Sequence, residues 1–255
     1  ILLLKKFFFS FKKIKYLNKK LNRERKICMV KRYGIFLIGL TFMSLGIVLI
    51  IKSVLGTSPI SSVPYVLSLA LPFTVGQFNF VFSSLMFILQ PIILRNKFEW
   101  VQILQVPMTF IFCAFIDLFM YIFAWLHPQA YYQHIFVLLI GCICMGIGVT
   151  CQLLGRVVML PGEGLVNAIA THWKLDFGKI KVIFDWSLVA IAGGLSLYYF
   201  GTIEGIREGT LVSAFATGLL VKFFMNMLLK FRVKRFGQLR QQYKMEKLKS
   251  KGNKV

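Results

Sequence analysis

Residues 33–51 read YGIFLIGLTFMSLGIVLII, nineteen positions without a charged side chain. A helix rises about 1.5 Å per residue, so this stretch is long enough to cross most of a bilayer core roughly 30 Å thick. Working outward from it, five more long apolar segments follow, at 78–94, 101–126, 135–154, 182–200 and 210–229. The whole chain of 255 residues is 57% hydrophobic and 16% charged, which excludes an ordinary soluble domain. The sequence therefore predicts an all-α protein, a polytopic transmembrane helical bundle.

Two shorter apolar segments, 59–73 and 161–173, lie between the long ones, and each begins with a proline. Proline suits the first turn of a helix, but a helix of this length does not reach across a bilayer. If the short segments enter the membrane and return, the chain has six spans. If they cross, it has eight.

An internal repeat with an offset of 102 residues relates the two halves of the chain. The offset pairs Leu37-Ile38-Gly39 with Leu139-Ile140-Gly141, Gly46 with Gly148, Pro59 with Pro161, Gly76 with Gly178, and Phe82 with Phe184. One pair of prolines and three pairs of glycines in one register indicate homologous halves, 33–126 and 135–229. Six spans give two inverted repeats, each with three spans and one short re-entrant helix, whereas eight spans give parallel repeats. Glycines spaced seven apart also predict close helix packing.

The net charge of +22 is concentrated in two tails. Residues 1–32 hold twelve of the 31 Lys and Arg, and residues 230–255 hold ten more. Basic segments beside spans remain in the cytoplasm, so we expect both termini on the cytoplasmic side of the membrane. Six spans also place Arg95, Lys97 and Arg156 inside, which favours six over eight. The tails suit anionic lipid as a partner, and we do not expect nucleic acid.

The first 28 residues have two interpretations. Met29 is followed by Val30-Lys31-Arg32 and the first span, which favours Met29 as the natural start and 1–28 as upstream translation. Alternatively, Phe7, Phe11 and Ile14 lie at helical spacing among lysines and could form an amphipathic surface helix.

Three motifs resemble the YczE/YyaS/YitT-like family of bacterial integral membrane proteins. They are Gly56-Thr57-Ser58-Pro59, Pro161-Gly162-Glu163-Gly164-Leu165, and Gly178-Lys179-Ile180-Lys181 with Asp185. The resemblance covers about residues 33–229 and neither tail. It implies a multi-spanning protein of the cytoplasmic membrane, and it implies no substrate and no catalytic residue.

Broken short helices in an inverted repeat point to a binding site near the membrane midplane. Ser58 would cap the helix that begins at Pro59, and Glu163 lies in a first turn, where free amides favour a carboxylate. We therefore expect a substrate site formed by the polar and small residues of both short segments: Ser58, Ser61, Ser62, Gly162, Glu163, Gly164 and Asn167.

Ionisable residues within spans are candidates for coupling transport to an ion or proton. Asp117 lies nine residues from the outer end of segment 101–126, Asp185 lies at the start of a span beside Lys181, and Lys222 lies seven residues from a cytoplasmic end. Each has a structural alternative, namely a hydrogen-bonded carboxyl group, a favourable first-turn charge, and a snorkelling lysine.

We expect a transporter or permease-like protein for a small solute. The alternative is a non-transporting membrane accessory protein whose basic tails recruit a cytoplasmic partner. A second copy of the chain is a further candidate partner. We expect no enzyme, cofactor or metal site, because the sequence lacks a His-Glu-x-x-His pair, a Gly-x-Ser-x-Gly elbow and a Walker A motif.

Overall fold

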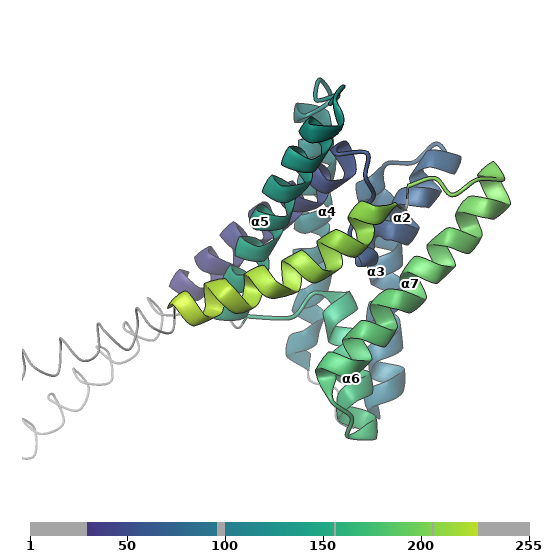
Figure 1. The fold of residues 1–255 in the computed structure, drawn as a ribbon. Coiled ribbons are helices and arrows are strands. Elements are labelled where there is room, and N and C mark those ends of the chain that lie inside the picture. The colour runs from purple at the N-terminus through teal and green to yellow at the C-terminus, as the bar shows by residue number, and fades with distance from the viewer. Residues whose placement is uncertain (1–29, 96–99, 156, 206, 229–255) are drawn as a thin grey trace, which may run out of the picture.

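The computed structural model describes residues 30–95, 100–155, 157–205 and 207–228. The interpretations of residues 1–28 and of the C-terminal tail therefore lie outside the described residues. The described chain is helical throughout (Figure 1). In chain order the elements are Val30–Lys52, α2 (Pro59–Ala70), α3 (Val75–Leu94), η2 (Trp100–Leu104), α4 (Gln105–Ile122), α5 (Tyr131–Gly155), α6 (Pro161–Trp173), α7 (Phe177–Phe200) and Glu208–Leu228.

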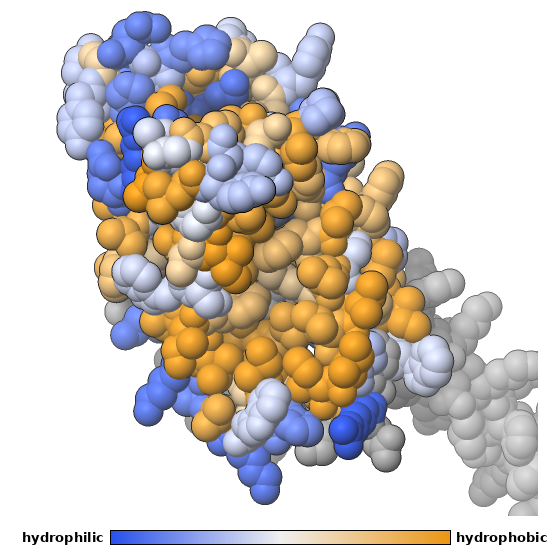
Figure 2. Space-filling model, turned by 90° about the vertical axis from the view of Figure 1, so that its right-hand side faces the viewer, coloured by the Kyte–Doolittle hydropathy of each residue, from blue (hydrophilic) through white to orange (hydrophobic). Residues whose placement is uncertain are grey.

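Six of these helical segments are long and apolar enough to cross a membrane, with η2 and α4 together forming one of them. The two short helices, α2 with 12 residues and α6 with 13, fall below that length. Apolar side chains cover the outside of the bundle, with Phe215 70% and Leu219 69% exposed. Figure 2 shows this apolar surface as a broad band between polar regions at the two ends. The prediction of an all-α, multi-pass membrane protein with six long apolar helices is confirmed.

Side-chain caps decide where two of the spans begin. Thr74 and Gln77 form a capping box at the start of α3, with Gln77 N donating to Thr74 Oγ1 at 3.1 Å. At the start of α7, Lys179 N donates to the side chain of Asp176 at 3.0 Å. Both helices therefore begin before the apolar segments predicted at 78 and 182. The predicted start of α7, at residue 182, was wrong by five residues. Hydropathy omits the polar first turn of a capped helix.

The first helix and α5 pack backbone to backbone at two points. A Cβ atom added at Gly39 would lie 2.9 Å from the carbonyl oxygen of Gly148, and one added at Gly46 would lie 2.8 Å from that of Gly141. A Cβ atom practically never approaches so closely, so any other residue would push these helices apart. The predicted close packing through glycines is confirmed.

We expect Gly148→Leu to destabilise the folded protein by about 1–3 kcal/mol, the usual cost of overpacking a core. The thermal stability of the purified protein in detergent, followed by size-exclusion chromatography, measures this effect. Gly194→Leu is the matched control, because a Cβ at exposed Gly194 meets nothing within 4 Å. Equal stability of the two variants would contradict the packing argument.

The two short helices lie at opposite ends of the bundle, and their amino termini meet inside it (Figure 1). α2 packs on α7 and α3, while α6 packs on α3 and α7. A Cβ added at Gly162, the second residue of α6, would collide with the side chain of Ile60, the second residue of α2. Each short helix therefore starts in the interior and runs outward.

Three hydrogen bonds join the segment before α2 to the start of the last helix. Gly209 N donates to Leu55 O at 2.8 Å, Thr57 N donates to Thr210 Oγ1 at 3.1 Å, and Ser213 Oγ donates to Thr57 O at 3.2 Å. We call this contact between residues 55–57 and 209–213 the clamp. Gly56 within it has φ 137°, a conformation that residues with a Cβ rarely adopt.

Candidate functional site

A cavity of about 550 Å³, the central cavity, lies where the two short helices begin. The first helix, the last helix and α2 to α7 all contribute lining residues, so the cavity belongs to the whole bundle. Much of the lining is apolar, including Met43, Phe112 and Met145. Its polar lining residues are Ser58, Asn79, Ser83, Glu163, Asn167, Lys181, Asp185, Ser213 and Thr217.

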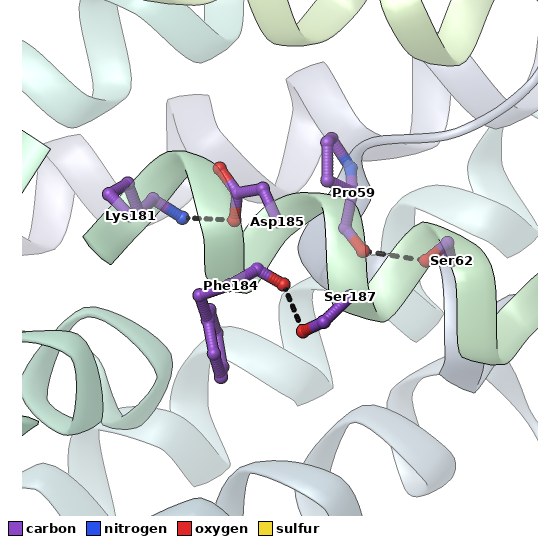
Figure 3. Close-up of polar contacts among 6 residues, drawn as sticks. All are labelled: Pro59, Ser62, Lys181, Phe184, Asp185 and Ser187. Carbon is purple, nitrogen blue, oxygen red and sulfur yellow. Dashed lines mark hydrogen bonds and ion pairs between the residues drawn. The ribbon is translucent and has the colours of Figure 1, made fainter. Parts of the chain in front are cut away.

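An ion pair on α7 faces this cavity. Lys181 Nζ lies 2.7 Å from Asp185 Oδ1, and the spacing of four residues places both side chains on one helix face. Figure 3 shows this pair, with Pro59 of α2 labelled in the same view. Asp185 is the ninth residue of α7, so its interpretation as a first-turn charge was wrong. The reason is that α7 begins earlier than predicted, at Phe177, with Asp176 as its N-cap residue.

Glu163 lines the same cavity from the first turn of α6, as its sequence position predicts. Within the described chain its carboxylate has no hydrogen bond and no ion pair, while it interacts electrostatically with Lys181 and Asp185. Two carboxylates and one ammonium group therefore come together, and only one of the carboxylates is paired.

Two hydroxyl groups at the cavity also lack a hydrogen-bond partner within the described residues. Ser58 is the N-cap residue of α2, as predicted, but its side chain makes no capping hydrogen bond. Its Oγ is buried and unpartnered, and so is Oγ1 of Thr217 on the last helix. A buried hydroxyl without a partner is costly, so both groups are available to hydrogen-bond a bound solute.

Three of the predicted binding residues do not line the cavity. Ser62 Oγ donates to Pro59 O at 2.6 Å within α2 (Figure 3). Gly164 packs against the amide of Gln90, so that an added Cβ would lie 2.8 Å from Nε2. Ser61 is fully buried in α2. Ser58, Gly162, Glu163 and Asn167 are the predicted residues that the structure brings to the cavity.

A buried pair of glutamines that the sequence reasoning missed anchors α6. Gln90 Nε2 donates to Gln105 Oε1 at 3.0 Å and to Pro161 O at 3.1 Å, and Gln105 Nε2 donates back at 3.1 Å. These contacts hold the beginning of α6, and therefore Glu163, against α3 and α4. The available signal was an amide within each of two apolar segments, since buried amides require partners.

The other two coupling candidates lie away from the cavity. Asp117 accepts hydrogen bonds from Thr74 Oγ1 and from Gly76 N, both at 2.8 Å. Because α4 ends at Ile122, Asp117 lies five residues from the end of that helix, where it contacts the start of α3. Lys222 is exposed on the last helix. The structure therefore unites Asp185 with Glu163 and separates both from Asp117 and Lys222.

We expect Asp117→Ala to lower stability by about 1.5–3 kcal/mol, because it removes hydrogen bonds to a charged acceptor at a helix start. Thermal unfolding of the purified protein measures this loss. The activity of the protein per folded molecule should be unchanged, since Asp117 does not line the cavity. Activity lost without a loss of stability would instead favour a coupling role.

A bundle of six long apolar helices around a partly polar cavity defines a multi-pass integral membrane protein. Residues 30–226 match the family model described as "Family of unknown function (DUF6198)", and the chain belongs to this family.

Two relatives agree with that assignment and with the resemblance to YyaS-like proteins. "Uncharacterized protein YyaS" of Bacillus subtilis is 32% identical over 198 residues, which cover 76% of this chain and 92% of the relative. An "Uncharacterized protein" of Haemophilus influenzae is 24% identical over 199 residues, covering 78% and 85%. No solved structure matches the chain.

Proposed function

We propose that this protein is a transporter of a small solute in the bacterial cytoplasmic membrane, with both termini in the cytoplasm. The solute would occupy the central cavity, and the two halves of the chain, as inverted repeats, would open it alternately to either side. The observation that carries the proposal is that equivalent residues of the two halves line the same cavity.

The glycine contacts support the inverted arrangement. Gly39 meets Gly148, and Gly46 meets Gly141. The offset of 102 residues makes Gly39 equivalent to Gly141 and Gly46 equivalent to Gly148. Each of the two contacts is therefore the equivalent of the other, as a two-fold axis requires. Gly39, the earlier glycine of the first helix, meets Gly148, the later glycine of α5, so the two helices run antiparallel. An axis relating antiparallel helices is perpendicular to them, and thus lies in the plane of the membrane.

The short helices obey the same relation. Ile60 and Gly162 are equivalent under the offset and contact each other, as residues at a two-fold axis would. The packing of α2 on α7 is equivalent to that of α6 on α3. The pairs of equivalent residues that line the cavity are Met43 and Met145, Ser58 and Leu160, Ile60 and Gly162, Asn79 and Lys181, Ser83 and Asp185, and Phe112 and Ala214. A site on such an axis is where inverted-repeat transporters bind their solutes.

The clamp supports a state that is closed at one end. It seals residues 55–57 against the last helix, whereas within the described chain no hydrogen bond joins the equivalent positions 157–159 and 107–111. Met159 is 39% exposed and lines the cavity. The end near Met159 also lies at the start of the first helix, where Arg32 Nε donates to Gly155 O at 2.9 Å. In the sequence this helix directly follows the basic N-terminal residues. The cavity would therefore face the cytoplasm in this state.

Cysteine labelling tests the topology. Phe73→Cys and Leu175→Cys introduce thiols at exposed positions after α2 and after α6. In intact cells, with native cysteines replaced, an impermeant maleimide should label position 73 and not position 175. With eight spans both positions would be cytoplasmic and neither would be labelled, which would contradict the inverted repeat.

Transport itself is tested in proteoliposomes with a library of small metabolites and dyes, with and without a proton gradient. We expect uptake of at least one solute by the full chain, and the same uptake after removal of residues 230–255. An accessory protein would depend on that tail for its biological effect and would transport nothing. This outcome would overturn the proposal.

A further inference from the structure

We propose that the central cavity selects an organic monocation with an apolar body, an alkyl- or arylammonium ion, whose charged nitrogen lies against Glu163. This inference rests on the proposed function, because it names the solute class of the same cavity.

The charge balance of the cavity favours a single positive charge. Lys181 is paired with Asp185 at 2.7 Å, which leaves the carboxylate of Glu163 without a counter-ion in the described chain. A carboxylate in a low-dielectric surrounding is strongly destabilised unless a cation or a proton joins it. An anionic solute would add to the repulsion, and a zwitterion would need Lys181 to leave Asp185.

Hydrogen-bond acceptors that line the same cavity as Glu163 suit an ammonium group. Ser58 is fully buried, lines the cavity and has a hydroxyl oxygen without a partner within the described residues. Thr217 offers a second such hydroxyl from the last helix. Ammonium groups donate up to three hydrogen bonds, which these oxygens and the carboxylate can accept. Asn167, one turn after Glu163 on α6, can contribute its amide oxygen.

The size and lining of the cavity require more than a bare ion. Its volume of about 550 Å³ is within the range of pockets for organic ligands. Met43, Phe112, Met145 and Val149 supply apolar surface to it. Within the described ranges no three His, Cys, Asp or Glu side chains are grouped as metal ligands. The apolar body of an organic cation would fill this space.

Asp185 also borders a side pocket of about 120 Å³ between α7 and the last helix. That pocket is lined by Trp186, Leu211 and Phe215, whose side chains are 53%, 43% and 70% exposed on the apolar outer surface. An acid thus lies where the polar cavity meets the lipid-facing surface. This junction suits a solute with a charged head and an apolar body, and not a sugar or an inorganic ion.

The charged residues that line the cavity all lie in the second half of the chain. Glu163, Lys181 and Asp185 are equivalent under the repeat offset to Ser61, Asn79 and Ser83, all of them neutral. The unpaired acid is therefore not a requirement of the repeated fold, because the first half builds the same helix start with a serine.

Direct binding tests the inference independently of transport. Calorimetric titration of the purified full chain in detergent would use four probes that share a phenyl ring: 2-phenylethylammonium, 2-phenylethanol, 3-phenylpropanoate and phenylalanine. We expect the cation to bind at least about tenfold more tightly than the others, because a missing or reversed charge loses the attraction of the carboxylate. Tightest binding by phenylalanine, equal binding by the alcohol, or no binding by the cation would overturn the proposal.

Three variants locate the charge that selects the cation. Glu163→Gln should weaken cation binding by about tenfold or more. Glu204→Gln, which neutralises an exposed acid outside the cavity, should leave it unchanged. Lys181→Gln should strengthen it, which keeps the test decisive if Glu163→Gln fails to fold. Equal effects of the two Glu variants, or weaker binding in Lys181→Gln, would overturn the assignment. Cation binding without transport would leave the ligand class standing and remove the proposed function, and transport of another solute without cation binding would do the reverse.

Discussion

A disulfide bond across the clamp should stop transport completely. Thr57→Cys and Thr210→Cys, combined in a chain without its native cysteines, place two thiols where Thr57 N and Thr210 Oγ1 are 3.1 Å apart. Under the proposed alternating access, residues 55–57 must separate from the last helix before the cavity can open at that end. A covalent link would hold the closed end shut. Uptake into proteoliposomes after mild oxidation is the measurement.

Each single cysteine variant controls for the loss of the threonine side chain, and both should transport with or without oxidation. A reducing agent should restore uptake in the double variant, which separates locking from misfolding. An oxidised, fully cross-linked double variant that transports at the unlinked rate would contradict the role of the clamp as the closed gate.

Glu163→Gln should abolish transport while the protein still inserts and folds. Glutamine keeps the size and hydrogen-bonding capacity of the side chain and removes only its charge. If Glu163 were merely a favourable first-turn carboxylate, its loss would cost about 0.3–1 kcal/mol of stability and no activity per folded molecule. Uptake normalised to folded protein, measured by size-exclusion chromatography, distinguishes the two roles. Glu204→Gln serves as the matched control, and full transport by Glu163→Gln would remove Glu163 from the site.

The spans could be predicted because a bilayer demands long apolar helices, and that demand is visible residue by residue. The glycine packing could be predicted because seven-residue spacing places Gly39 and Gly46 on one helix face. The starts of α3 and α7 could not be read from hydropathy. They depend on capping side chains at Thr74 and Asp176, which are polar and therefore resemble loop residues.

The candidate site was predictable in part. Ser58 stood out because it directly precedes the proline that starts one short helix, and Glu163 stood out because it lies in the first turn of the other. Lys181 and Ser83 were missed, since their role depends on which faces of α7 and α3 turn toward the cavity. Asp117 was expected in the membrane interior as a coupling group, and only the fold shows its carboxylate at the amino terminus of α3. Long-range partners of this kind have no signature in local sequence.

The neutral and charged halves of the cavity have a thermodynamic consequence. Two identical inverted halves would make the inward-open and outward-open forms equal in free energy, so that an empty protein would populate both equally. Every difference between equivalent positions, such as Ser61 against Glu163, shifts that population, and a shift of about 1.4 kcal/mol changes the ratio tenfold. Under the proposed alternating access, the resting orientation of the protein would therefore be set by how far its two halves have diverged, and exchanging residues between equivalent positions would tune it.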